Sequence, residues 1–164
     1  MISCHPSSPG VRSMRSHHVM AAAAVLLTAA CLPTQQTATP PCESRVIKGE
    51  VPLWARAGFS PGAEAPYASS RRGDMLAVLF GYPLHSPPLP DRGNKILWRS
   101  KVPVTPSEPL LIEARLNGVG EPTRITIEHG PGPSAVDLPE PGCWRLNLTW
   151  SSHTDSIDLE YSAG

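Results

Sequence analysis

The stretch Trp144-Arg-Leu-Asn-Leu-Thr-Trp150 alternates strictly between apolar and polar residues. A period of two residues is typical of a strand with one buried face and one face in water. A turn-like stretch at 151–155 follows, after which Ile157, Leu159 and Tyr161 alternate with acidic residues. The end of the chain is therefore predicted to be an antiparallel hairpin with its tryptophans in the core.

Five segments upstream also carry strand signals: residues 45–51, 75–80, 95–101, 110–116 and 124–128. Residues 75–80 are a continuous apolar run, which suits a strand covered on both faces. No segment shows sustained helical periodicity, and residues 61–70 are expected to form one helical turn at most. The pattern predicts an all-β chain: an antiparallel β-sandwich, Ig-like, of six to seven short strands, with a small closed barrel as the alternative.

The composition agrees with short strands joined by turns. The chain has 164 residues, 20 of them proline and 13 glycine. A length of this order allows one modest domain. Because proline is tolerated in a helix only in its first turn, this composition disfavours a helical bundle.

The N-terminal region is predicted to direct export. Arg15 lies in a basic stretch, and Val19–Ala30 is a run of 12 residues that is apolar except for Thr28. Crossing a bilayer takes about 20 apolar residues, so the run suits a signal peptide over 1–30, with 1–13 a mis-called start. Residues 31–44 are Thr/Pro-rich, typical of a linker, which leaves 45–164 for the sandwich.

The residues around Cys31 indicate how the chain is processed. Leu27-Thr-Ala-Ala-Cys31 resembles a bacterial lipobox, although Thr28 stands where that pattern usually has leucine. The resemblance implies lipidation of Cys31 and a protein tethered to the outer face of the cytoplasmic membrane. Ordinary secretory cleavage near Ala30, which would release a soluble protein, and a buried apolar helix of an unprocessed chain are the alternatives.

Charge limits the partners. The chain has 14 basic and 14 acidic residues, and two of the basic ones, Arg12 and Arg15, lie before the apolar run. The remaining 12 basic residues face all 14 acidic ones, a formal charge of −2. Nothing in this balance attracts a phosphate backbone, so nucleic acid is not an expected partner. The expected partners are the membrane, through Cys31, and an envelope protein or glycan.

Four cysteines bear on the oxidation state: Cys4, Cys31, Cys42 and Cys143. Signal cleavage removes Cys4 and lipidation occupies Cys31, which leaves Cys42 and Cys143 as a pair in an oxidising compartment. A disulfide between these two would close a loop of about 100 residues. Two free thiols are the other interpretation.

Few residues point to chemistry. His85, His129 and His153, with Cys143 and Met75, are the candidates for a copper-type site, but the close Cys–His–Met spacing of such sites is missing. No G-x-S-x-G motif supports a hydrolase. Asp155, Asp158 and Glu160 could pair for acid–base chemistry, but Asp158 and Glu160 are better explained as the wet face of the last strand. The sequence therefore predicts no cofactor, metal site or catalytic residue.

Four short motifs are better explained by structure than by function. Arg72-Gly-Asp74 fits a turn before the 75–80 strand, and Pro87-Pro-Leu-Pro90 fits a stiff loop. Asn147-Leu-Thr149 is a glycosylation sequon inside a predicted strand. Trp54 and Trp98 would mark a partner or sugar surface only if both were exposed.

The end of the chain also resembles a known group of proteins. Pro141-Gly-Cys-Trp144, the alternating strand after it and the acidic-apolar final strand are similar to uncharacterised bacterial secreted or lipoprotein domains with an Ig-like fold. The resemblance covers about the last 25 residues and the signal, and an Arg-over-Lys bias of 11 to 3 fits an actinobacterial type. It implies architecture and location, and it transfers no catalytic residues.

Together these features predict a non-enzymatic interaction or structural module of the cell envelope. A surface-presented carrier of a small ligand or of copper is the second hypothesis. An envelope hydrolase is the third.

Overall fold

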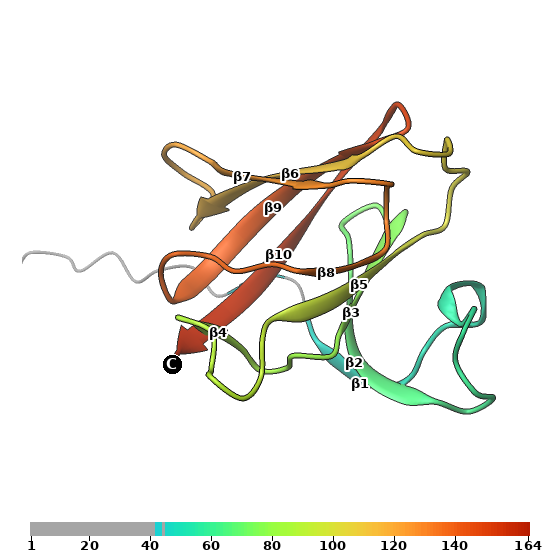
Figure 1. The fold of residues 1–164 in the computed structure, drawn as a ribbon, viewed down its shortest axis with the longest axis horizontal. Coiled ribbons are helices and arrows are strands. Elements are labelled where there is room, and N and C mark those ends of the chain that lie inside the picture. The colour runs from blue at the N-terminus through green and yellow to red at the C-terminus, as the bar shows by residue number, and fades with distance from the viewer. Residues whose placement is uncertain (1–41, 44) are drawn as a thin grey trace, which may run out of the picture. The chain divides into compact units, whose positions relative to one another are not determined.

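The computed structural model describes residues 42–43 and 45–164, and over these residues the chain forms ten strands and one short 3₁₀ helix (Figure 1). In chain order the elements are β1 (Ile47–Glu50), η1 (Leu53–Ala55), β2 (Glu64–Ser69), β3 (Met75–Leu79), β4 (Leu84–Ser86), β5 (Lys95–Ser100), β6 (Leu110–Leu116), β7 (Thr123–Ile127), β8 (Pro133–Ala135), β9 (Gly142–Trp150) and β10 (His153–Ala163). The predicted signal peptide, Cys31 and most of the 31–44 linker lie outside the described residues.

The strands form two five-stranded sheets. Sheet A has the order β1-β2-β3-β5-β8 and sheet B the order β4-β10-β9-β6-β7. Neighbouring strands pair antiparallel, except that β4 runs parallel to β10. The predicted β-sandwich is confirmed. Because each sheet ends in two edge strands, the closed barrel is wrong.

The expected number of strands, six to seven, is too low. All seven segments that carried a strand signal form strands, and the structure adds β2, β4 and β8. Two of the additions, β4 and β8, are three residues long, too short to show a period. The helical turn expected within 61–70 is wrong, because residues 64–69 pair with β1 and β3 as β2.

The main core consists of side chains from both sheets. Figure 1 shows the strands of these two sheets. Trp98, Trp144 and Trp150 are at most 4% exposed and are all part of it. Each indole N–H is satisfied, Trp98 by Ser134 Oγ, Trp144 by the Glu140 carbonyl and Trp150 by Ser100 Oγ. Burying a tryptophan is favourable when its polar N–H has a partner. The predicted hairpin, with its tryptophans inside, is confirmed.

A second, smaller cluster covers the outer face of sheet A. Leu76 and Val78 point away from the main core and are fully buried beneath Val51 and Ala55. The segment 51–60, which contains η1, supplies this cover. All five residues of β3 are consequently buried, which confirms the expectation of a strand covered on both faces.

None of the described residues belongs to a helix with the length and apolar character that a membrane crossing requires.

Candidate interaction surface

Sheet B leaves an outer face of polar side chains on β6, β7, β9 and β10. Cross-strand neighbours form three rows on it: Thr126, Leu111, Thr149 and Thr154 in the first, Arg124, Glu113, Asn147 and Ser156 in the second, and Arg115, Arg145 and Asp158 in the third. The first row is exposed throughout, and Leu111, the apolar residue in it, is 44% exposed. Hydroxyl and amide groups therefore dominate the open part of this face.

Two shallow hollows lie side by side on this outer face. One, of about 320 Å³, spans β6, β7 and β9, and the other, of about 470 Å³, extends over β10 to Arg71 and Arg72. Asn147 and Thr149 of β9 line both hollows. The two hollows are thus neighbouring parts of one depression that crosses the sheet and is lined by both polar and apolar groups.

An ion triad fixes the second row. Arg115 Nη2 lies 3.1 Å from one carboxylate oxygen of Glu113, and Arg124 Nε lies 3.2 Å from the other. The hydrogen bond from Arg115, with that from Arg124, lowers the pKa of Glu113. The triad therefore keeps opposite charges together on the face instead of leaving a free carboxylate.

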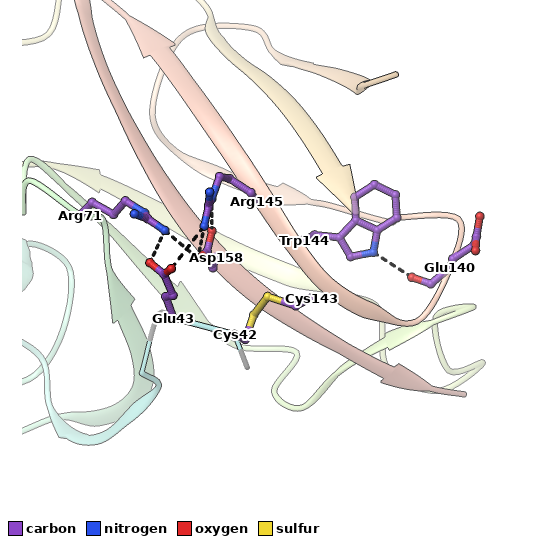
Figure 2. The surroundings of a disulfide bond; sticks show 8 residues. All are labelled: Cys42, Glu43, Arg71, Glu140, Cys143, Trp144, Arg145 and Asp158. Atoms are coloured by element: carbon purple, nitrogen blue, oxygen red, sulfur yellow. Dashed lines mark hydrogen bonds and ion pairs between the residues drawn. A yellow bond between two sulfur atoms is a disulfide. The ribbon is translucent and has the colours of Figure 1, made fainter. Parts of the chain in front are cut away.

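The third row is closed by exposed and half-exposed charged side chains that surround one buried carboxylate, that of Asp158 (Figure 2). Asp158 is 3% exposed and receives two hydrogen bonds from Arg145, at 2.9 and 3.1 Å, and one from Arg71 at 3.2 Å. Burial alone would raise the pKa of Asp158, but the two guanidiniums lower it overall. Glu43 pairs with Arg71 and, at 3.8 Å, with Arg145.

The expectation that Asp158 lies in water is therefore wrong. The strand alternation assigns the right face, but Arg71, Arg145 and Glu43 cover the carboxylate there. Glu160, two residues further along, is exposed as expected.

Asp155 lies on the opposite side of β10, because its parity in the strand differs from that of Asp158. Its carboxylate accepts hydrogen bonds from Ser70 Oγ at 2.5 Å and from the backbone N–H groups of Arg72, Asp74 and Ser156 at 3.1, 3.3 and 2.7 Å. Burial raises the pKa of Asp155, but these bonds lower it overall. Asp155 therefore anchors the β2–β3 turn to β10, and the three carboxylates do not converge as an acid–base pair.

The structure joins Cys42 to Cys143 in a disulfide, with Cα atoms 5.3 Å apart and a sequence separation of 101 (Figure 2). Cys143 belongs to β9, next to Arg145. Together the disulfide and the ion pairs of Glu43 hold residues 42–43 against sheet B. These two residues, expected in the linker, thus belong structurally with the sandwich.

The candidate metal ligands are dispersed. Among the described residues, no three His, Cys, Asp or Glu side chains form a group that could hold a metal ion. Cys143 is oxidised, Met75 is fully buried in the core, and the ring of His153 packs on Trp150 at 5.8 Å. His85 Nδ1 lies 3.1 Å from the carbonyl of Ala163, and His129 occupies a turn with φ of 67°.

The sequence motifs have structural positions. Residues 71–74 form the turn before β3, as expected, with Gly73 in the left-handed region and Arg72 Nη2 donating to Thr154 Oγ1 at 3.2 Å. Pro87–Pro90 lies in the loop after β4. Trp98 is fully buried while Trp54, on η1, is 40% exposed, so the pair does not mark a shared surface.

A third hollow, of about 390 Å³, adjoins the disulfide. Its floor includes Leu79, Leu84 and Leu159, each 1% exposed, with Tyr82 and Glu160 also in its lining.

No family model, no curated protein and no solved structure matches the chain. Fold and surface therefore define the class: a disulfide-linked two-sheet sandwich with one open polar face.

Proposed function

We propose that this protein is an exported, lipid-anchored domain of the cell envelope that works by non-covalent binding and not by catalysis. The observation that carries the proposal is the open outer face of sheet B, where Asn147 and Thr149 line two adjoining hollows. In contrast, the carboxylates Asp155 and Asp158 are held in structural bonds.

The chemistry of this face favours a glycan as the ligand. Threonine and serine hydroxyls and the amide of Asn147 both donate and accept hydrogen bonds, as sugar hydroxyls do. Arg72 and Arg124 extend the donors to opposite ends of the depression. An envelope protein is the other partner considered.

A cysteine pair supports an exported location. Structural disulfides persist in oxidising compartments, and Cys42 and Cys143 are paired in this fold. In this proposal the lipid on Cys31 holds the sandwich to the outer face of the cytoplasmic membrane, and secretion follows where Cys31 is not lipidated.

Calorimetric titration of the full chain with solubilised envelope polysaccharide tests the binding proposal. We expect the double variant Asn147→Ala, Thr149→Ala to bind at least about tenfold more weakly, because each lost hydrogen bond is worth about 1 kcal/mol. Glu64→Ala, at an exposed position of β2, is the matched control and should bind normally. Equal binding by both variants and the unmodified chain would refute the assignment of the face. If the chain retained an envelope protein and bound no glycan, the ligand of this face would be that protein.

Palmitate labelling tests the anchor separately. The expressed chain should incorporate label, and Cys31→Ala should lose both the label and its membrane fraction while keeping the Cys42–Cys143 disulfide. Label that persists in Cys31→Ala would contradict the anchor and leave the binding face untouched.

A further inference from the structure

The two sheets end in four edge strands: β1 and β8 in sheet A, and β4 and β7 in sheet B. An edge strand presents unpaired N–H and C=O groups that invite another strand, and proteins usually blunt such edges. The four edges of this molecule differ in how well they are blunted.

The edge of β4 is closed by a side chain. The backbone N–H of His85 donates to Asn94 Oδ1 at 2.9 Å, and Asn94 Nδ2 donates back to the His85 carbonyl at 2.8 Å. Asn94 is 1% exposed, and its amide also donates to Asp137 at 2.8 Å. The amide of Asn94 thus takes the place that a neighbouring strand would occupy.

The edges of sheet A are short or interrupted. β8 has three residues and begins with Pro133, which has no N–H to donate. β1 has four residues and contains Lys48 and Gly49, both of which oppose the addition of a further strand. Each of these edges carries a recognised form of protection.

The edge of β7 is less protected, because its one charged residue, Arg124, is paired with Glu113 of the neighbouring strand. Its five residues, Thr-Arg-Ile-Thr-Ile, include no proline, glycine or lysine, and they pair with β6 in an unbroken register. Within the described residues, the backbone bond that β7 makes outside this register is the turn bond from Gly130 N–H to the Ile127 carbonyl. Threonine and isoleucine are also strong strand formers.

We propose that β7 pairs antiparallel with β7 of a second copy of this chain, about a two-fold axis at Ile125. In this register Arg124 lies opposite Thr126 of the other copy, and Thr123 lies opposite Ile127. A register centred on Arg124 would place two guanidiniums directly opposite each other, which is unfavourable. The strand is therefore self-complementary, as a two-fold interface requires.

The local charge supports a second copy as the occupant. Arg124 is already paired with Glu113 of its own chain, so the guanidinium at the joined edge has a carboxylate partner. Half-buried Ile125 and Ile127 would be covered further. The pairing would join two five-stranded B sheets into one and place their polar outer faces side by side. This inference does not depend on the proposed function.

Sedimentation equilibrium of the full chain in non-ionic detergent, over a wide concentration range, tests the pairing. We expect a monomer–dimer equilibrium. Thr126→Lys places a lysine opposite Arg124 at two symmetric positions and should weaken the dimer at least about fivefold, while Thr126→Glu should strengthen it by a similar factor. Ser162→Lys is the matched control, since it adds the same charge at an exposed position of β10 in the same sheet, and it should leave the monomer–dimer equilibrium unchanged.

If the chain stays monomeric at every concentration, the proposal is overturned, and any partner of the β7 edge is an extended segment other than a second β7. Equal behaviour of the two Thr126 variants also overturns it, because no register would then oppose residue 126 to Arg124. Hydrogen exchange of the unmodified chain gives an independent readout. The β7 amides should become more protected as concentration rises, whereas protection independent of concentration contradicts the pairing.

Discussion

The outer faces of the two sheets differ in burial, although both sheets belong to one sandwich: that of sheet A is covered and most of that of sheet B is open. On sheet A, Leu76 and Val78 are fully buried beneath the 51–60 segment. On sheet B, Asn147 and Thr149 stay exposed, and only the end near Cys143 is crossed by residues 42–43. The sequences of the strands already carry this difference, since β3 is apolar at every position and β9 alternates.

The comparison shows what each cover is made of. Sheet A is covered by apolar packing, which excludes water without needing exact partners. Sheet B is covered by a covalent bond and by guanidinium–carboxylate pairs, which need specific partners and leave the neighbouring rows free. The covered end of sheet B is therefore a structural feature, and the open rows are the part of the face that the proposed ligand would contact.

Removing the disulfide should have the largest effect. Reduction, or the double variant Cys42→Ser, Cys143→Ser, opens a loop with a sequence separation of 101 residues. A loop of that length is worth up to about 4.7 kcal/mol in the chain-entropy model. Urea unfolding with and without reductant measures this loss. Reductant should cause no additional loss in the double variant, which has no disulfide. If the urea midpoint of the unmodified chain did not change on reduction, the disulfide-linked N-terminal cover of sheet B would add no stability.

Truncation of the apolar cover should have the next largest effect. Leu76→Ala removes a fully buried side chain from the outer face of sheet A and should cost about 3 kcal/mol. Leu111→Ala is the matched change on the outer face of sheet B, where the residue is 44% exposed, and should cost below about 1 kcal/mol. Thermal unfolding of both variants measures the difference. Equal losses would contradict the distinction between a covered and an open face.

Loss of the Asp155 charge should cost somewhat less. Asp155→Asn places an amide N–H₂ among donors that now point at a carboxylate, so we expect a loss of about 2 kcal/mol in the free energy of unfolding. Glu160→Gln, an exposed change on the same strand, should be neutral within about 0.5 kcal/mol. A double-mutant cycle with Ser70→Ala checks the cause: the coupling between residues 70 and 155 should account for part of the loss, and additive effects would argue against the bond.

Periodicity was sufficient to predict most of the fold. A strand with alternating or continuous apolar residues over five positions or more gives a signal, as β9 and β3 do. β2 gave none, because Pro66 and two alanines hide its alternation. β4 and β8 have three residues each, which is too few to show an alternating pattern, and they are defined by partners distant in the chain.

The candidate site was less predictable. A two-residue turn at 151–152 places Arg145 opposite Asp158 in the hairpin, so this ion pair could have been found by counting register. Arg71 and Glu43 lie 87 and 115 positions before Asp158 in the sequence, and no local sequence pattern predicts that these residues come together. The polar rows became visible only when the order of β7, β6, β9 and β10 was known.

Acid should lower the free energy of unfolding by less than Asp155→Asn does. The folded-state pKa values of Asp155 and Asp158 are lowered below their ordinary value. A carboxyl whose pKa is lower in the folded state contributes stability above its unfolded pKa of about 3.9, and this contribution is lost as pH falls through the folded pKa. Stability should thus be constant down to about pH 5 and decline below about pH 4.

The acid effect is smaller than that of Asp155→Asn because a protonated carboxyl keeps its shape and one acceptor oxygen for the surrounding N–H groups. Urea unfolding of the unmodified chain between neutral and acid pH measures the decline. Asp155→Asn should show a shallower decline, since one of the two carboxyls no longer titrates, and the Leu76→Ala control should keep the full slope. A slope unchanged by Asp155→Asn would assign the acid sensitivity to other carboxyl groups.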